Sequence, residues 1–175
     1  MLGLIKPQQP VAGAMDDRIS HNTFTRFNVP KEGLDFDNRF AGARTIISEV
    51  TGSERSLIKG NVEIVGQRAH VFIANPNGLL VDGARFLKTG GVSLSTGTIG
   101  FVERVPAPFR TQINTTLNVT QGEILVAEGG LSGAMDTLHF LSKSLRVDGE
   151  VTNENTSPFS GIEITAGNSS AEFDS

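Results

Sequence analysis

Few side chains in this sequence are placed to do chemistry, and the most suggestive pair is Ser20 and His21. A serine beside a histidine could supply a nucleophile and its general base, as in acyl transfer. Adjacent residues on an extended strand point to opposite faces, however. The chain also lacks the Gly-x-Ser-x-Gly elbow that presents a nucleophilic serine at a sharp turn. The pair therefore favours a structural or recognition role over catalysis.

Metal chemistry has equally little support in the residues. Asp35–Asn38 resembles the start of a calcium loop, but Phe40 and Ile46 stand where such loops need glycine and glutamate. His70 and His139 lie in apolar stretches without a partner at ligand spacing, so we interpret them as hydrogen-bonded or surface histidines. The absence of cysteine excludes disulfides, thiolate zinc sites and a cysteine nucleophile. We expect no metal, no cofactor and no enzymatic activity.

Composition narrows the possible partners. A net charge of −4 and a pI near 5.4 argue against a nucleic-acid binder, which needs a basic face for phosphate contacts. No apolar run approaches the ~18 residues of a membrane-spanning helix, so we expect no stable membrane insertion. The length of 175 residues is typical of one domain with a substantial core.

The stretch from Asn61 to Gly97 indicates which secondary-structure elements the chain forms. It contains short β-type runs separated by tight turns at Gly66, Asn75–Gly78, Gly83 and Gly90-Gly91; the runs are Val62–Val65, His70–Ala74, Leu79–Val81 and Val92–Ser95. No window has a sustained helical period. Strands this short, each ended by a turn, predict an all-β chain that turns a corner every few residues and stacks on itself as a β-solenoid.

The central turn, Asn75-Pro76-Asn77-Gly78, has a suitable residue at every position. Asn75 can fold its side chain back onto nearby backbone N–H groups, and Pro76 presets φ for the second position. Asn77 tolerates the bridge or left-handed region, and Gly78 closes the turn without a Cβ clash. The four residues could serve folding alone, or they could also be recognised directly by a partner.

The whole chain, 1–175, is predicted to form one domain. Residues 1–44 are predicted to form an amino-terminal β cap and leading strands, with Phe24, Phe27 and Val29 over one end of the core and Leu34, Phe36 and Phe40 pointing inward. Residues 45–175 are predicted to form the coils. Pro106 and Pro108 interrupt an irregular part that is either an excursion near 97–112 or a short extra hairpin. After it, alternation over Ile113–Thr120 predicts a return to the coils, with Ile113, Leu117 and Val119 pointing inward.

An ordered set of motifs extends over nearly the whole chain. The motifs are Ser20-His21-Asn22, Phe27-Asn28-Val29, Gly33-Leu34, Glu49–Gly52, Gly60–Glu63, Gly66-Gln67, Ile73–Gly78, Asp82-Gly83 and Ser95–Gly97. In this order they resemble the amino-terminal secretion domain of two-partner-secretion exoproteins, a family that includes filamentous haemagglutinin, exported haemolysins and contact-dependent inhibition toxins. A second Asn-Pro-Asn-Leu motif of many members is absent between Asn38 and Thr45, which indicates a divergent branch.

The resemblance implies a right-handed parallel β-helix with an amino-terminal cap and small extra-helical hairpins. It also implies a partner, the periplasmic POTRA domains of a cognate outer-membrane TpsB-type transporter. The expected protein is a monomer, secreted by a Gram-negative bacterium or displayed on its surface, with its signal peptide outside this sequence. The residues expected to carry recognition or fold nucleation are Asn75, Pro76, Asn77 and Gly78, supported by Ser20, His21, Asn22, Phe27 and Asn28.

Two alternatives stay open at this point. One is a carbohydrate-active or carbohydrate-binding β-helix, although the chain has no Trp or Tyr and its regular rungs carry only isolated acids, Glu63, Asp82 and Glu123. The other is an adhesive module that binds a surface ligand directly, without a transporter.

Overall fold

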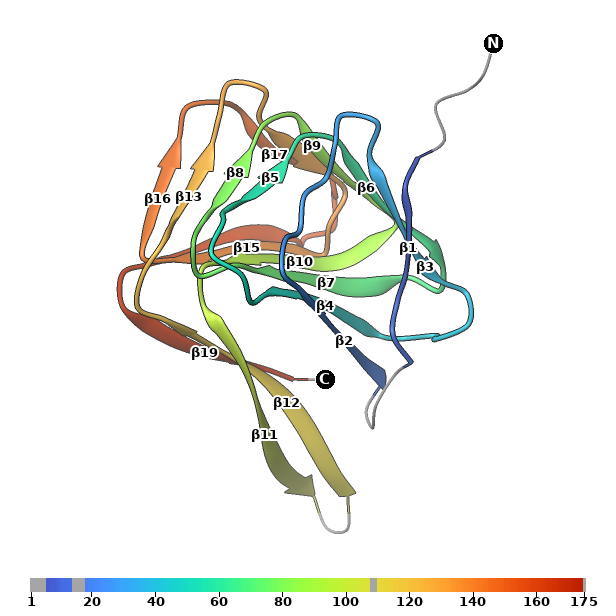
Figure 1. The fold of residues 1–175 in the computed structure, drawn as a ribbon. Helices are drawn as coiled ribbons and strands as arrows, with labels where there is room; N and C mark the ends of the chain where they lie inside the picture. Colours follow the sequence, from blue (N-terminus) through green and yellow to red (C-terminus); the bar gives the residue numbers. More distant parts are fainter. Residues whose placement is uncertain (1–5, 14–17, 108–109, 175) are drawn as a thin grey trace.

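The computed structural model describes residues 6–13, 18–107 and 110–174, and its regular elements are β-strands (Figure 1). No α-helix occurs within these ranges. In the same part of the chain, accordingly, no helix is long and apolar enough to cross a bilayer.

Three parallel sheets form the faces of the main body (Figure 1). Sheet A has the order β1 (Gln8–Pro10), β3 (Leu34–Asn38), β6 (Asn61–Gly66), β9 (Ala84–Leu87), β14 (Leu131–Gly133) and β17 (Val151–Asn153). Sheet B has the order β2 (Ile19–Phe24), β4 (Thr45–Val50), β7 (Ala69–Ala74), β10 (Thr89–Ser95), β15 (Thr137–Ser142) and β18 (Gly161–Ala166). Sheet C has the order β5 (Ser56–Ile58), β8 (Leu79–Val81), β13 (Glu123–Val126) and β16 (Ser144–Val147).

The chain visits sheets A, B and C in turn, so each strand inside a sheet pairs in parallel with strands one coil earlier and one coil later, and an edge strand with one of them. In sheet B, for example, Val71 pairs with Ile46 of the preceding coil and with Val92 of the next. The predicted parallel β-helix is therefore confirmed. The leading segment takes part in it, because β1 and β2 pair in parallel with β3 and β4 and form the first coil.

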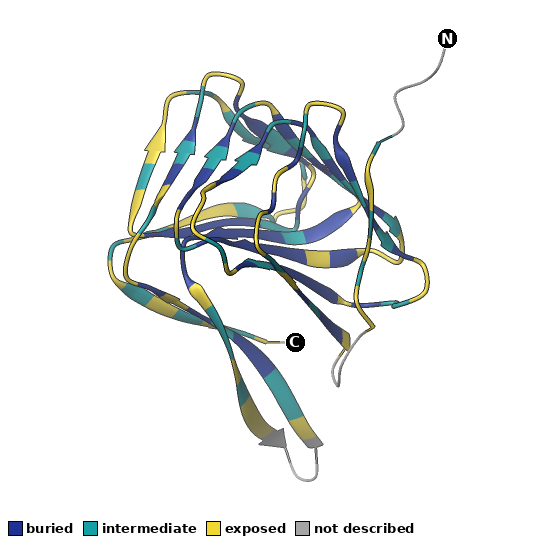
Figure 2. Ribbon diagram, viewed as in Figure 1, coloured by how far each residue is buried: buried dark blue, intermediate teal, exposed yellow. Residues whose placement is uncertain are grey.

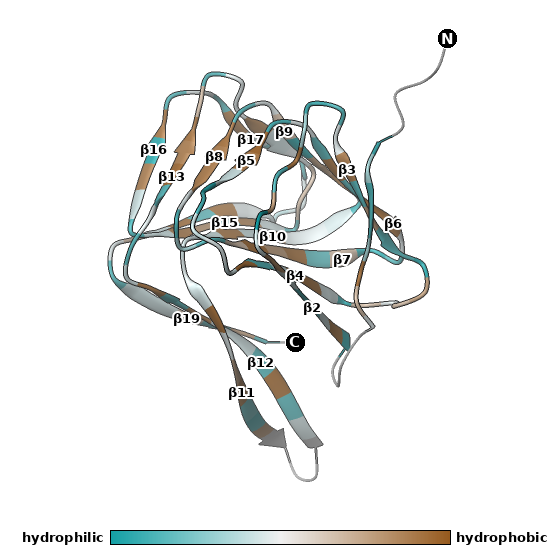
Figure 3. Cartoon of the chain, in the orientation of Figure 1, coloured by the Kyte–Doolittle hydropathy of each residue, from teal (hydrophilic) through white to brown (hydrophobic). Residues whose placement is uncertain are grey.

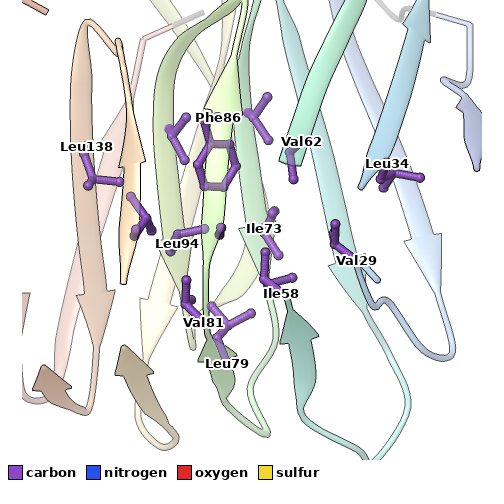
Figure 4. Close-up of a cluster of buried hydrophobic side chains, with 14 of the residues drawn as sticks. Val29, Leu34, Ile58, Val62, Ile73, Leu79, Val81, Phe86, Leu94 and Leu138 are labelled. Carbon is purple, nitrogen blue, oxygen red and sulfur yellow. The ribbon is translucent and has the colours of Figure 1, made fainter. Parts of the chain in front are cut away.

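The core lies inside the three sheets, where inward side chains of successive coils stack on one another. Alternation produces this arrangement: in β6, Val62 and Ile64 are fully buried while Glu63 between them faces outward. Figure 4 shows Val62 and Phe86 of sheet A and Leu94 of sheet B within one cluster of buried side chains, and Figure 3 shows apolar residues recurring along the strands. Each fully buried aliphatic or aromatic side chain contributes about 1.5–3 kcal/mol relative to exposure.

A fourth sheet lies outside the helix. Sheet D is antiparallel, with the order β11 (Thr98–Ala107), β12 (Arg110–Val119) and β19 (Ser169–Phe173). The hairpin β11–β12 leaves the helix between β10 and β13 and projects beyond the body (Figure 1). Of the two interpretations of residues 97–112, the structure has the extra hairpin, and it extends beyond the predicted bound to Val119. Residues 108 and 109 lie outside the described ranges.

The prediction that Ile113–Thr120 returns to the coils is wrong. Residues 113–119 belong to β12, and Leu117 and Val119 are buried in a second apolar cluster between sheets D and B. In that cluster they pack with outward-facing residues of sheet B such as Ile47 and Phe72. Alternation predicts which side chains are buried but not which sheet lies opposite them, so a strand of either core has the same pattern.

A second expectation also fails, because Phe40 is 94% exposed instead of pointing inward. It follows the end of β3 and lies in the turn that leads to β4, beyond the last inward position of sheet A. Phe27, Val29, Leu34 and Phe36 are buried as predicted, and Phe24 packs partly buried against the same cluster.

The second cluster supplies a test of how firmly sheet D is held. Leu117→Ala removes a fully buried side chain and is expected to lower the free energy of unfolding by about 2–5 kcal/mol. Phe159→Ala, at a side chain that is 93% exposed, is expected to change it by less than about 0.5 kcal/mol. Chemical denaturation of both variants measures the difference, and equal small effects would show that the hairpin packs loosely.

The last coil is the least covered part of the helix. Val126, Leu138 and Phe140 of the preceding coil point into the core and are buried. Their register partners in the last coil are Val147, Ile162 and Ile164, and these three side chains are exposed. Figure 2 shows β16 largely exposed, whereas Ile124 and Val126 of β13 beside it are buried. The side chains of this coil therefore continue the stacks of the core and form an exposed apolar surface at this end of the helix.

Candidate functional site

The Asn75–Gly78 turn forms a corner between sheet B and sheet C, where β7 ends and β8 begins. Gly78 N donates to Asn75 O at 3.0 Å and closes the turn. Asn75 Oδ1 accepts from Asn77 N at 2.9 Å, as the sequence predicts for an asparagine in the first position. The corner is therefore a tight turn held by its own side chain.

Asn75 also joins this corner to the preceding coil. Its amide is fully buried, and its Nδ2 donates to Glu54 O at 2.9 Å and to Ser56 Oγ at 3.0 Å. Asn77 makes a parallel link, with Nδ2 donating to Gly52 O at 2.7 Å. Each asparagine thus fixes the distance between two stacked corners, which strand pairing alone does not specify.

The next coil packs closely on the other side of the turn. Gly78 has φ of +109°, and a Cβ built on it would lie 2.8 Å from Glu123 O. Gly122 has φ of +87°, and its Cβ would lie 2.7 Å from Pro76 O. Gln121 Nε2 also donates to Pro76 O at 3.2 Å. Glycine is required here both by the left-handed backbone and by the approach of the neighbouring coil.

The segment 52–57, which contacts the corner, is a part of the site that the sequence does not reveal. It follows β4 and places Gly52, Glu54 and Ser56 against the two asparagines. The signal that could have identified it is Ser56, a small hydroxyl residue in an otherwise apolar strand and fully buried in the fold. Its hydroxyl is satisfied by Asn75, so the two positions depend on each other.

Phe27 and Asn28 lie in the same column of corners, one coil before the 52–57 segment and two coils before Asn75–Gly78. Asn28 is exposed, and its Oδ1 accepts from Leu57 N at 2.9 Å. Phe27 is buried and stacks on Phe36 with ring centroids 6.1 Å apart. The 52–57 segment therefore contacts both predicted groups, which lie on opposite sides of it in the stack.

Ser20 and Asn22 lie away from this column, in the edge strand β2 of the first coil. Their side chains belong to β2 and are buried, with Ser20 Oγ donating to Ala12 O at 2.7 Å. Asn22 Oδ1 accepts from Ala12 N at 2.8 Å, and its Nδ2 donates to Ile47 O at 3.1 Å. These bonds hold the chain around Ala12 across the edge strand of sheet B, which would otherwise leave polar groups unpaired.

His21 points to the opposite face, as an alternating strand requires. Its Nε2 lies 2.7 Å from Glu49 Oε2, and its ring meets Phe101 of the hairpin edge-to-face at 5.3 Å. Ser20 and His21 therefore cannot act as a nucleophile and base, because their side chains are on different faces of one strand. His21 instead connects the hairpin to the first two coils.

The other two histidines line a groove on the outer face of sheet B, and burial is the main cause that lowers the pKa of each. His70 Nδ1 accepts from Gly91 N at 2.7 Å, and His139 Nε2 lies 3.2 Å from Thr165 Oγ1. The neighbouring carboxylates of Asp136 and Glu163 partly oppose the lowering of the two pKa values, at His70 and His139 respectively. Both are hydrogen-bonded, as the sequence predicts.

These lowered pKa values predict how stability depends on pH. Between the folded pKa and the reference value of 6.5, the unfolded chain binds more protons than the folded one. The free energy of unfolding is therefore expected to be constant above about 6.5 and to fall as pH decreases through that value. Denaturation curves over about one pH unit on either side of 6.5 measure the slope. His139→Gln should reduce it, and stability that is flat or rises on acidification would contradict the prediction.

The polar side chains of Asp35–Asn38 bond to neighbouring residues of the fold. Two hydrogen bonds from the Arg39 guanidinium lower the pKa of Asp37 to about 2. Asp35 pairs with Lys6 at 3.2 Å, and the buried amide of Asn38 bonds to the backbone of Ala43 and Gln67. In the described ranges, no group of three or more His, Cys, Asp or Glu side chains could hold a metal ion.

Comparison with known proteins agrees with this architecture. The family described as "TPS secretion domain" matches residues 7–175. The chain is 34% identical over 152 residues to the toxin CdiA of Escherichia coli, covering 74% of this chain and 5% of the relative. It is 28% identical over 183 residues to the filamentous hemagglutinin of Bordetella pertussis (strain Tohama I), covering 92% of this chain and 5% of the relative.

A solved structure gives the same result for the fold. The crystal structure of a filamentous hemagglutinin secretion domain superimposes with a TM-score of 0.83 at 25% identity, covering 98% of this chain and 62% of that chain. The chain spans only about 5% of the length of these two curated relatives. Because the family match extends from residue 7 to residue 175, the chain belongs to the TPS secretion domain family.

Proposed function

We propose that this chain is the export address of a larger exoprotein, bound by the periplasmic POTRA domains of a cognate outer-membrane TpsB-type transporter. After passage through the transporter, the domain nucleates folding of the β-helix at the cell surface. The single observation that carries the proposal is the family membership of residues 7–175. The stack of cross-linked corners at Asn75–Gly78 supports it.

The topology supports folding that proceeds coil by coil. Each strand of sheets A, B and C pairs with strands one coil away, so a coil can form as soon as the preceding one is in place. The Asn75 side chain reaches back to the preceding coil, where its Nδ2 donates to Glu54 O and Ser56 Oγ, so these bonds can form before the next coil has emerged. Burial of the apolar core then offsets the ordering entropy outside the membrane, and no nucleotide is required.

The exposed end of the helix supports the same mechanism. Val147, Ile162 and Ile164 present an apolar surface, and each is the register partner of a core residue in the preceding coil. Such an end can template a further coil from whatever chain follows. Export of a long passenger would then be driven in one direction, since each folded coil makes backward movement costly.

Secretion with and without the transporter tests the proposal. The domain, placed behind a signal peptide and carrying a reporter, is expected in the medium only when a cognate transporter is co-expressed. Accumulation in the periplasm despite the transporter would contradict it. A domain that instead binds immobilised glycans without a transporter would favour the adhesive alternative.

A further inference from the structure

The corner contains Asn77-Gly78, a dipeptide of a type that is reactive in flexible chains. Asn77-Gly78 is the one Asn-Gly pair in the sequence. In a flexible chain, the backbone nitrogen of the glycine can attack Cγ of the asparagine, because no Cβ hinders its approach. A new N–Cγ bond forms, the Cγ–Nδ2 bond breaks, and the side-chain nitrogen leaves as ammonia with the proton of the attacking amide. Water then opens the cyclic imide to aspartate or isoaspartate.

The folded corner restrains both reacting groups. The attacking nitrogen, Gly78 N, is buried and donates to Asn75 O at 3.0 Å. The leaving nitrogen, Asn77 Nδ2, donates to Gly52 O at 2.7 Å and to Asn75 Oδ1 at 2.9 Å. Attack requires these bonds to break and the Asn77 side chain to rotate toward Gly78. Asn77 is therefore exposed to water and yet held away from the reactive conformation.

The product cannot rebuild the corner. Aspartate at position 77 has no donor for Gly52 O, and its carboxylate would face both that oxygen and Asn75 Oδ1. Isoaspartate adds a methylene to the backbone between Asn75 O and Gly78 N, the two atoms that close the turn. Either change removes a link between stacked coils.

We propose that Asn77-Gly78 is a deamidation site gated by folding, labile while the chain is unfolded and protected once the corner forms. Its consequence for export rests on the proposed function, because a chain held unfolded for transport stays in the labile state until it folds. A chain that stalls before export would lose the ability to form this corner.

Mass spectrometry of the whole 175-residue chain tests the chemistry without a transporter. The chain is incubated in mildly alkaline buffer, folded or in guanidinium chloride, and the peptide containing Asn77 is followed for conversion of amide to acid. Conversion is expected to be at least about tenfold faster in the unfolded chain, because the folded corner reacts only through local opening. The peptide containing Asn118 is the internal control, since Val119 after it hinders the attack.

An Ile64→Asp variant, with a charge in the core, gives the unfolded state without denaturant and should convert as fast as the denatured chain. Equal rates in folded and unfolded chains would overturn the gating, and no conversion in the unfolded chain would overturn the site. In a secretion assay, Asn77→Asp is expected to reduce export relative to Asn118→Asp. Fast conversion in the unfolded chain together with normal export of Asn77→Asp would support the deamidation site and overturn only its proposed effect on export.

Discussion

Replacing Gly78 with alanine is expected to lower the free energy of unfolding by about 2–5 kcal/mol. Two costs add. A φ of +109° is strained for any residue with a Cβ, and the new Cβ would lie 2.8 Å from Glu123 O of the next coil. The carbonyl belongs to a paired strand, so it cannot move aside without disturbing β13.

Gly167 offers a matched control for this prediction. It has the same φ of +109°, but nothing lies within 4 Å of a Cβ built there. Gly167→Ala is therefore expected to cost only the backbone strain, about 1–3 kcal/mol. Denaturation of both variants separates the two costs, and equal losses would show that the contact with the next coil contributes nothing. If the corner must form for export, Gly78→Ala should also be secreted less than Gly167→Ala.

The second large effect is expected for Asn75→Ala, at about 2–4 kcal/mol. The substitution leaves Glu54 O and Ser56 Oγ without the donor that satisfies them, and Asn77 N without its acceptor. Asn75 is fully buried, so water cannot readily replace the lost bonds. The loss should appear both in denaturation and in reduced secretion of a full-length protein.

Asn118→Ala is the control, because this asparagine is exposed on the hairpin and should change stability by less than about 0.5 kcal/mol. Asn75→Ala with unaltered stability would contradict the proposed role of its amide. Unaltered stability together with lost secretion would instead indicate direct recognition of the corner by the transporter.

The sequence predicts much of this fold because its strongest signals are local. Short alternating runs ended by glycine and asparagine specify strands and corners, and the Asn75–Gly78 turn forms as its residue types require. The order of motifs, which resembles one family, indicates the parallel coils that local patterns leave open. Burial follows the alternation at Val62 and Ile64.

The features that the sequence does not predict depend on long-range partners. Leu117 alternates like a core residue but faces sheet B from outside, and nothing local distinguishes the two cores. Phe40 is exposed because its position after β3 depends on where sheet A ends. The contact of Asn75 with Glu54 and Ser56 joins residues about one coil apart, a distance set only by the stacking of coils.

The most direct test of the export address is binding of the chain to purified POTRA domains of a candidate transporter, in folded and unfolded states. Ile64→Asp supplies the unfolded chain in native buffer and leaves the predicted recognition residues intact. We predict a Kd of about 1 μM or tighter for the unfolded chain, weaker binding for the folded one, and a loss when Asn75–Gly78 is also changed. Absence of binding in both states would contradict the account.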